Sequence, residues 1–190
     1  GLYTVHHTPE QVLSHDYLSR HPKEYYQFVM DHMYFPAAQP NIIHRELARY
    51  GKLGAWTITQ NVDGLDIKAG NPRVVQFHGN LYDLYCQKCG QTVSFDEYQQ
   101  SDHHALDGGI IRGRVVLYGE AIDPDNLRRA QQILQVADMI VIVGTSFQVY
   151  PFAQLVSYRQ AFVPVYVINQ EPTILNQATT FHLLQEDATT

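Results

Sequence analysis

The first fifty residues carry apolar side chains at the spacing of three and four residues that is typical of amphipathic helices. The segments 9–21, 22–35 and 40–51 each open on a proline, which is favoured at the first helical position. The last of them ends on Gly51, a common residue at the end of a helix. The pattern therefore predicts three short helices before residue 52.

After Gly51 the pattern changes to short runs that are rich in β-branched and aromatic residues. These predicted strands are 55–59, 73–77, 138–144 and 164–169. Continuous apolar runs, as in DMIVIVG, favour strands that are covered on both faces, as in a parallel sheet. A predicted helix over 123–137 precedes the third strand. The alternation predicts an α/β fold with a Rossmann-like, doubly wound parallel sheet.

Residues 82–113 interrupt this alternation with polar, turn-rich sequence that contains the two cysteines. We interpret this stretch as an inserted small module. The predicted organisation is a helical lead-in over 1–50, a nucleotide-binding domain over 51–81 and 114–190, and the inserted module over 82–113.

Composition narrows the classes of function. Apolar residues make up 45% of the 190 residues and charged residues 17%, which favours a globular protein without membrane spans. The net charge of −6 and the absence of a basic run argue against direct nucleic-acid binding. The cysteines form one C-x-x-C and no leader is apparent, so we expect a cytoplasmic protein.

Polar side chains follow three of the predicted strands. In open α/β sheets, ligands bind beyond the carboxyl ends of the strands. The residues at these ends are Gln60, Asn61 and Asp63; Gly144, Thr145 and Ser146; and Asn169 and Gln170.

Each of these features also has a purely structural interpretation. The pair Asn61 and Asp63 is typical of an Asx-turn, and Thr145 is typical of a helix cap. His78, between Phe77 and Gly79, is by itself more typical of a half-buried histidine than of a catalyst. A role in catalysis therefore needs support from the wider pattern.

Six motifs, in order, supply that support across nearly the whole chain. They resemble the motifs of the sirtuins, the NAD-dependent protein lysine deacylases. The motifs are TQNVDGLDIKAG, VVQFHGNL, the C-x-x-C, GGIIRGRVVLYGE, MIVIVGTSFQVYP and VYVIN. The resemblance implies the sirtuin NAD-binding fold, in which a Rossmann-like domain carries a small helical and zinc-ribbon-like module.

The resemblance also implies a reaction and its base. In sirtuins the acyl-lysine carbonyl attacks the nicotinamide ribose and releases nicotinamide, and a histidine then activates a ribose hydroxyl to give O-acyl-ADP-ribose. His78 matches this histidine, and an imidazole with a reference pKa of about 6.5 suits proton removal near neutral pH. We therefore expect an enzyme, with an acylated-lysine protein or peptide as substrate.

Binding residues follow from the same resemblance. Asn61 and Asp63 are expected to line the nicotinamide pocket, with Gln60 beside the ribose. Gly144, Thr145 and Ser146 match the turn that contacts phosphate and adenosine ribose. The remaining expected cofactor contacts are Asn169, Gln170, Asp187 and Ala188. The expected substrate contacts, on two edges between which a peptide adds as a strand, are Val116, Leu117, Tyr118, Gly119, Glu120, Phe147 and Val149.

The chain departs from the sirtuin pattern at its start and in its metal module, among other places. Sirtuins open on a glycine-rich GAG-x-S loop, and this sequence starts beyond it, so we expect a trimmed version of a longer protein. Sirtuins also usually bind structural zinc through two C-x-x-C pairs, whereas here only Cys86 and Cys89 are present. His103, His104 or Asp107 are candidates to complete a mixed site, but the incomplete cysteine set favours loss of the metal.

Two other functions use the same residues. A sirtuin-like ADP-ribosyltransferase or NAD glycohydrolase would pass the activated ribose to another acceptor or to water. A nucleotide-binding module without turnover belongs to a different class of protein.

Overall fold

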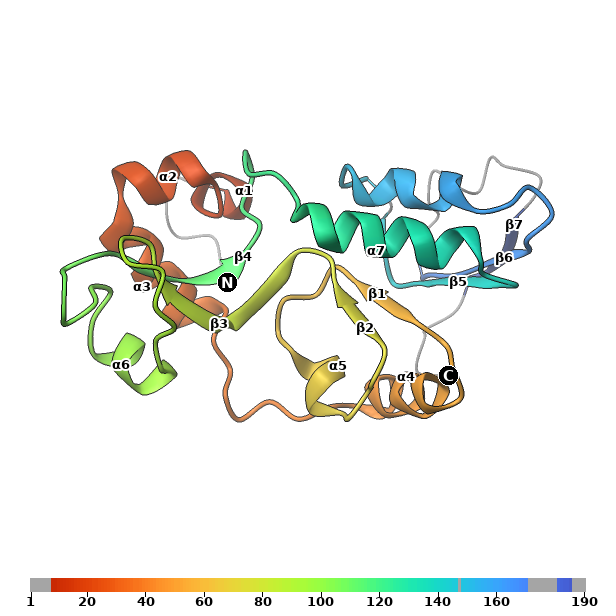
Figure 1. Ribbon diagram of the computed structural model, residues 1–190, viewed down its shortest axis with the longest axis horizontal. Helices are drawn as coiled ribbons and strands as arrows, with labels where there is room; N and C mark the ends of the chain where they lie inside the picture. The colour runs from red at the N-terminus through yellow and green to blue at the C-terminus, as the bar shows by residue number, and fades with distance from the viewer. Residues whose placement is uncertain (1–7, 147, 171–180, 186–190) are drawn as a thin grey trace. The chain divides into compact units, whose positions relative to one another are not determined.

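The computed structural model describes residues 8–146, 148–170 and 181–185, which fall into two compact units (Figure 1). The first unit contains Gly1–Gln39, Asn61–Lys68 and His78–Ile122. The second contains Pro40–Gln60, Ala69–Phe77 and Asp123–Thr190. The three-part division expected from the sequence stays a prediction. Among the described residues, no helix is both long and apolar enough to span a bilayer.

The first unit opens with three helices, α1 (Pro9–Val12), α2 (His15–Arg20) and α3 (Pro22–His32). The single helix predicted over 9–21 is wrong at its centre, because the chain breaks there to pair with a distant segment. Tyr118 donates its N–H to the carbonyl of Leu13 at 2.9 Å, and its own carbonyl accepts from the N–H of His15 at 2.9 Å.

A two-stranded antiparallel sheet forms the centre of the first unit. Strand β3 (Gly79–Cys86) pairs with β4 (Ile111–Val115), and the pairing register shifts between Asn80 and Leu84. This irregularity interrupts the alternation of buried and exposed residues, which is why the sequence pattern did not predict β3. Two short helices, α5 (Leu65–Lys68) and α6 (Phe95–Gln100), complete the unit.

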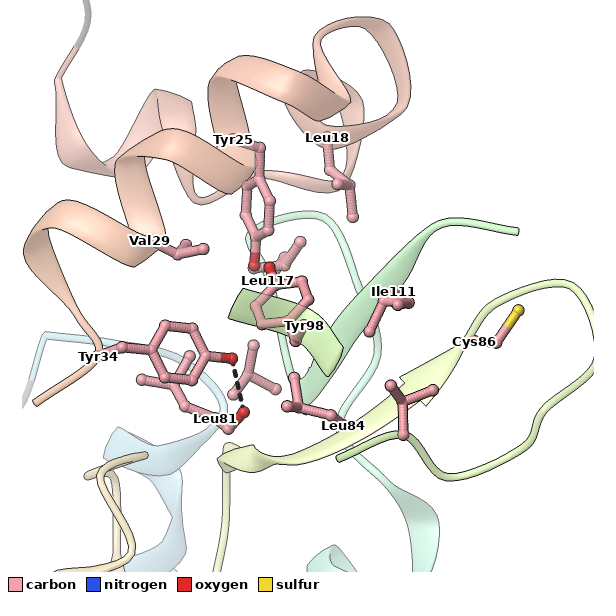
Figure 2. Close-up of a cluster of buried hydrophobic side chains, with 12 residues drawn as sticks. Leu18, Tyr25, Val29, Tyr34, Leu81, Leu84, Cys86, Tyr98, Ile111 and Leu117 are labelled. Atoms are coloured by element: carbon pink, nitrogen blue, oxygen red, sulfur yellow. Dashed lines mark hydrogen bonds between the residues drawn. The ribbon is translucent and has the colours of Figure 1, made fainter. Parts of the chain in front are cut away.

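The core of the first unit lies between α2, α3 and this sheet (Figure 2). The hydroxyl of Tyr34 donates to the carbonyl oxygen of Leu81 at 2.7 Å, so this buried polar group is satisfied. Burial also raises the pKa of Tyr25 to about 12. The buried cluster comprises Leu18, Tyr25, Val29, Tyr34, Leu81, Leu84, Cys86, Val93, Tyr98, Ile111, Val115 and Leu117.

The second unit carries the four parallel strands that the sequence predicted and a further one, β7, that it did not. Strand β1 (Thr57–Thr59) pairs with β2 (Val74–Gln76), and β5 (Ile140–Val143) pairs with β6 (Val165–Ile168), which pairs with β7 (Phe181–Leu184). Its helices are α4 (Ile42–Lys52), α7 (Pro124–Gln135) and the 3-10 helix η1 (Phe152–Tyr158). Helices packed on parallel strands confirm the predicted α/β class.

Strand β5 differs from the prediction that both faces of its apolar run are covered. Ile142 is 9% exposed and lies in a cluster with side chains of η1, whereas Val141 is 48% exposed and Val143 is 39% exposed. In Figure 1, α7 and η1 lie on the same side of the β5–β6–β7 sheet. The described residues therefore cover only one face of this strand.

Gly79, next to the candidate base, begins β3 and pairs with Val115 of β4. Its φ is +84°, and a Cβ atom built there meets the carbonyl oxygen of Arg114. Gly70 has a similar φ of +79° with nothing within 4 Å of a Cβ. Alanine at either position has to adopt a left-handed backbone conformation, which should cost about 1–2 kcal/mol of stability. Only Gly79→Ala should also push β3 and β4 apart and lose further stability.

Urea unfolding of the two alanine variants separates these costs. We expect Gly79→Ala to lose about 1–3 kcal/mol more free energy of unfolding than Gly70→Ala, as overpacked sites do. Equal losses would mean that the strands are not in contact at Gly79.

Candidate active site

In the first unit, Asp63 is fixed by its own backbone. Its Oδ1 accepts from the N–H of Leu65 at 2.9 Å, which confirms the Asx-turn interpretation and starts α5. The carbonyl of Val62 accepts from the N–H of Leu81 at 2.9 Å, so this loop is tied to β3. Asn61 precedes this turn and is exposed. The loop thus holds an amide and a carboxylate two residues apart, and their contact with nicotinamide stays a prediction.

His78 lies in the turn between β2 and β3 and is half-buried. Its carbonyl oxygen accepts from the N–H of Val116 at 2.9 Å. The backbone of His78 is therefore anchored beside β4, independently of the imidazole. Its predicted role as general base stays a prediction.

In the second unit, two of the predicted cofactor residues are in direct contact. The side-chain N–H of Gln60 donates to Oγ1 of Thr145 at 2.9 Å, and so joins the carboxyl ends of β1 and β5. Gly144 has a φ of +61°, which favours glycine, and its N–H donates to the carbonyl of Ile168 at 3.0 Å. The turn thus pairs with the end of β6, and the space beside the Cα of Gly144 is open.

The same edge carries the predicted ribose-binding residue. Val143 and Ile168 are register partners in the parallel pair β5–β6, so Gly144 and Asn169 follow them at the same edge. The N–H of Asn169 donates to the carbonyl of Leu184 at 3.2 Å, which fixes its backbone. Open α/β sheets bind ligands at this edge, and the contacts of Gly144, Thr145 and Asn169 with NAD stay predictions. Ser146 and Gln170, also expected here, are exposed.

The predicted substrate segment 116–120 is braced by a buried arginine. Arg112 is 3% exposed, and its guanidinium donates to both carboxylate oxygens of Glu120, at 2.6 and 3.0 Å. It also donates to the carbonyl of Val115 at 2.6 Å, and Glu120 accepts from the N–H of Leu117 at 2.9 Å. One ion pair therefore fixes the course of the backbone over 115–120.

The charges of this pair stabilise one another. Although burial opposes ionisation, hydrogen bonds from Arg112 hold the pKa of Glu120 below its usual value. Burial likewise disfavours the charged guanidinium, and yet the carboxylate raises the pKa of Arg112. Sequence analysis missed Arg112 as a positioning residue. The available signal was a charged residue within the apolar run IIRGRVV.

The other predicted substrate residues differ in exposure. Tyr118 is 50% exposed and Val149 is 37% exposed, whereas Leu117 is 4% exposed and belongs to the core of the first unit. Val116 is half-buried and Gly119 exposed. Contacts of these residues with a substrate stay predictions. The predicted contacts Phe147, Asp187 and Ala188 lie outside the described residues.

A separate cluster in the first unit is able to hold a metal ion. One ligand atom from each of Cys86, Cys89, His104 and Asp107 lies within 4.8 Å of the other three. His103 is not part of it, because its Nδ1 lies 2.8 Å from a carboxylate oxygen of Asp102. Of the three residues named as candidates to complete a mixed site with Cys86 and Cys89, His104 and Asp107 thus lie beside the two sulfurs. Two sulfurs, an imidazole and a carboxylate fit the ligand preferences of Zn²⁺.

Comparisons with known proteins identify the same family as the sequence motifs do. A profile of the Sir2 family matches residues 2–151. The chain belongs to the Sir2 family. It is 50% identical over 189 residues to an NAD-dependent protein deacetylase of Lactiplantibacillus plantarum, and this alignment covers 99% of the chain and 80% of the relative. A second NAD-dependent protein deacetylase, of Enterococcus faecalis, is 44% identical over 100% of the chain and 79% of the relative.

Solved Sir2 structures confirm the predicted fold. A structure of Sir2 with a p53 peptide and NAD⁺ matches with a TM-score of 0.84 at 28% identity, over 95% of this chain and 80% of that one. A structure of Sir2Tm bound to a propionylated peptide matches with a TM-score of 0.85 at 29% identity, over 93% of this chain and 78% of that one. The resemblance to sirtuins inferred from the motifs is thereby confirmed.

Proposed function

We propose that this Sir2-family chain is an NAD-dependent protein deacetylase that converts acetyl-lysine and NAD into lysine, nicotinamide and O-acetyl-ADP-ribose. The observation that carries the proposal is the 50% identity, over 99% of the chain, to a relative that bears this name. The reaction belongs to the transferases, because the acetyl group passes to a ribose hydroxyl.

The residues supply binding and proton transfer. At the carboxyl edge of the second unit, Gly144 leaves room for a phosphate, and Thr145 and Asn169 offer hydrogen-bonding groups to the adenosine part. In the first unit, Asn61 and Asp63 are suited to pair with the nicotinamide carboxamide. His78 then accepts a proton from a ribose hydroxyl, as the general base.

The substrate is proposed to be an acetylated lysine in an extended peptide. Strand addition reads the peptide through its backbone and tolerates many sequences. The segment 116–120, which Arg112 braces, is the proposed docking edge in the first unit. A cytoplasmic location is also proposed, because both cysteines are free thiols and a reducing compartment keeps them so.

Mass spectrometry of one reaction tests this proposal. The purified protein is incubated with an acetyl-lysine peptide, with and without NAD. We expect deacetylated peptide, nicotinamide and O-acetyl-ADP-ribose in equal amounts, and no product without NAD. Free ADP-ribose with intact acetyl-peptide would indicate an NAD glycohydrolase. Transfer of ADP-ribose to a protein would indicate an ADP-ribosyltransferase. No turnover together with calorimetric binding of NAD would indicate a nucleotide-binding module.

A further inference from the structure

Two arginines of the second unit differ from all the others in their surroundings. The chain has nine arginines, and all of them lie in described parts of the structure. Seven have a carboxylate or a backbone carbonyl of the chain as partner. Among the described residues, the guanidinium groups of Arg73 and Arg129 have no such partner. Their N–H donors are therefore available to a molecule from outside.

Both guanidinium groups lie against Trp56, which is the only tryptophan of the chain. Cζ of Arg129 lies 4.6 Å from the centre of the indole ring, and Cζ of Arg73 lies 5.4 Å from it. At such distances the face of an aromatic ring attracts a cation. The ring thus holds two positive charges at one place on the surface, and neither charge is compensated by a described carboxylate.

Helix α7 is held against β2 in the register that brings Arg129 to the ring. The side-chain amide of Asn126 donates to the carbonyl of Gln76 at 3.1 Å. Arg129 follows three residues later and so lies on the same face of the helix. The arginine therefore approaches Trp56 from a helix whose position is fixed by a separate hydrogen bond.

A buried asparagine fixes the two strand starts that carry Trp56 and Arg73. Asn71 is 6% exposed; its Oδ1 accepts from the N–H of Arg73 at 3.0 Å, and its Nδ2 donates to Oγ1 of Thr57 at 2.9 Å. The N–H of Thr57 also donates to the carbonyl of Arg73 at 2.8 Å. A Cβ atom built on Gly51 would meet Oδ1 of Asn71, so α4 packs directly on this asparagine. The backbone under the ring and under Arg73 is thus ordered before any partner binds.

We propose that Trp56, Arg73 and Arg129 form a docking site for an acidic segment of a partner protein. A guanidinium group presents paired N–H donors at the spacing of the two oxygens of a carboxylate. A bound carboxylate supplies the negative charge that the two neighbouring guanidinium groups lack. Tryptophan and arginine are also the side chains that most often dominate the binding energy of protein interfaces.

A short acidic peptide fits this site better than a nucleic acid does. The net charge of −6 opposes the approach of a long polyanion, whereas a short segment carries only a few charges. A nucleic-acid site also needs cationic side chains along several successive phosphates. Leu53, three residues before Trp56, is 74% exposed and offers an apolar contact to a peptide side chain. The expected segment therefore combines carboxylates with an apolar residue.

The site lies at the end of β1 that is opposite to the proposed cofactor edge. Trp56 directly precedes this strand, and Gln60, which contacts Thr145, directly follows it. A segment bound at Trp56 therefore leaves the carboxyl ends of the strands free. The role of the site is recruitment of a partner, and its occupation should not inhibit the proposed reaction.

The fluorescence of Trp56 measures binding at this place, because no other tryptophan contributes to the emission. The probe is a peptide of four glutamates around a central leucine, blocked at both ends, and the control peptide has four glutamines instead. We expect a saturable change in emission with the acidic peptide, which weakens at high salt, and an affinity at least tenfold lower for the control. Equal affinity for both peptides, or no response to either, would overturn the proposal.

Matched variants test whether the two arginines act as a site. Arg73→Gln and Arg129→Gln each remove one guanidinium group, so each should weaken binding by about three- to tenfold. The control Arg128→Gln removes the same charge from the next residue of α7, where the guanidinium is paired with Asp125 at 2.8 Å. It should bind the acidic peptide with nearly parental affinity. Equal losses in all three variants would mean that only net charge matters, and no docking site would remain.

Two other occupants are distinguished by the same variants. A single-stranded oligonucleotide that binds more tightly than the acidic peptide, and loses affinity in Arg129→Gln, would overturn the proposal in favour of a nucleic-acid site. Self-association in sedimentation that Arg129→Gln abolishes would overturn it in favour of a second copy of the chain. Deacetylation of a short neutral acetyl-peptide should keep its parental rate in Arg129→Gln, so the docking site and the proposed function are tested separately.

Discussion

Replacing His78 by alanine should lower the rate of peptide deacetylation by about 100- to 10,000-fold, the range that loss of a general base produces. The sirtuin resemblance places the base after the release of nicotinamide. Exchange of labelled nicotinamide into NAD should therefore persist in His78→Ala while O-acetyl-ADP-ribose disappears. The two assays are run on the same preparation with an acetyl-lysine peptide.

The variant is expected to fold, because the anchoring hydrogen bond of this turn comes from the carbonyl of His78 and alanine keeps it. His32→Ala is the matched control, since His32 is exposed in the last turn of α3. It should keep both activities. Full deacetylation by a folded His78→Ala variant would exclude His78 as the base and leave the family assignment intact.

The sequence predicted the second unit better than the first. Helix α7, predicted over 123–137, is observed as Pro124–Gln135, because the side chain of Asp123 accepts from the N–H groups of Asp125 and Asn126 and caps it. Apolar runs likewise marked β1, β2, β5 and β6, whereas β7 was not predicted. In the first unit, β3 carries a register shift, and no simple period predicts such a strand.

The candidate site could be predicted in part. Polar residues at strand ends were found because parallel strands finish at one edge, and Gln60 does contact Thr145 there. The residues of the metal cluster were named as candidates, but their meeting in one cluster and the Arg112–Glu120 pair could not be found this way. Both join residues whose proximity depends on tight turns and on the shifted β3–β4 register, which composition and spacing do not encode.

Arg112→Met should destabilise the first unit by about 2–4 kcal/mol, because it leaves the half-buried carboxylate of Glu120 without its partner. The change also removes the donor to the carbonyl of Val115. Urea unfolding measures the loss. The matched control is Arg114→Met on the same strand, where Arg114 is 46% exposed and lies 3.5 Å from Asp83. An exposed pair of this kind contributes about 0–1 kcal/mol.

A double variant separates the charge from the packing. Adding Glu120→Leu to Arg112→Met removes the unpaired carboxylate, so it should recover much of the lost free energy of unfolding. If the double variant is as unstable as the sum of the two single variants, the cost lies in packing and backbone hydrogen bonds instead of in the unpaired charge.

The pH dependence of the free energy of unfolding is an independent measure of the contribution of the Arg112–Glu120 pair. The pKa of Glu120 is lower in the folded protein than its ordinary value of 4.5, so the folded state binds fewer protons there than the unfolded state. The pair therefore contributes its full stability above about pH 4.5, and this contribution is lost as the pH falls through the folded pKa. Arg112→Met removes the group that lowers this pKa, so its stability should fall less steeply with acid than that of the parent, while Arg114→Met keeps the parental slope.

The same variant connects the ion pair to the proposed substrate edge. Glu120 holds the N–H of Leu117, and Arg112 holds the carbonyl of Val115, so the pair orders the backbone on which a peptide is proposed to add. At a temperature where Arg112→Met remains folded, its KM for the acetyl-peptide should rise severalfold more than its KM for NAD. A uniform fall in kcat with both KM values unchanged would separate this ion pair from substrate binding and limit its role to the stability of the first unit.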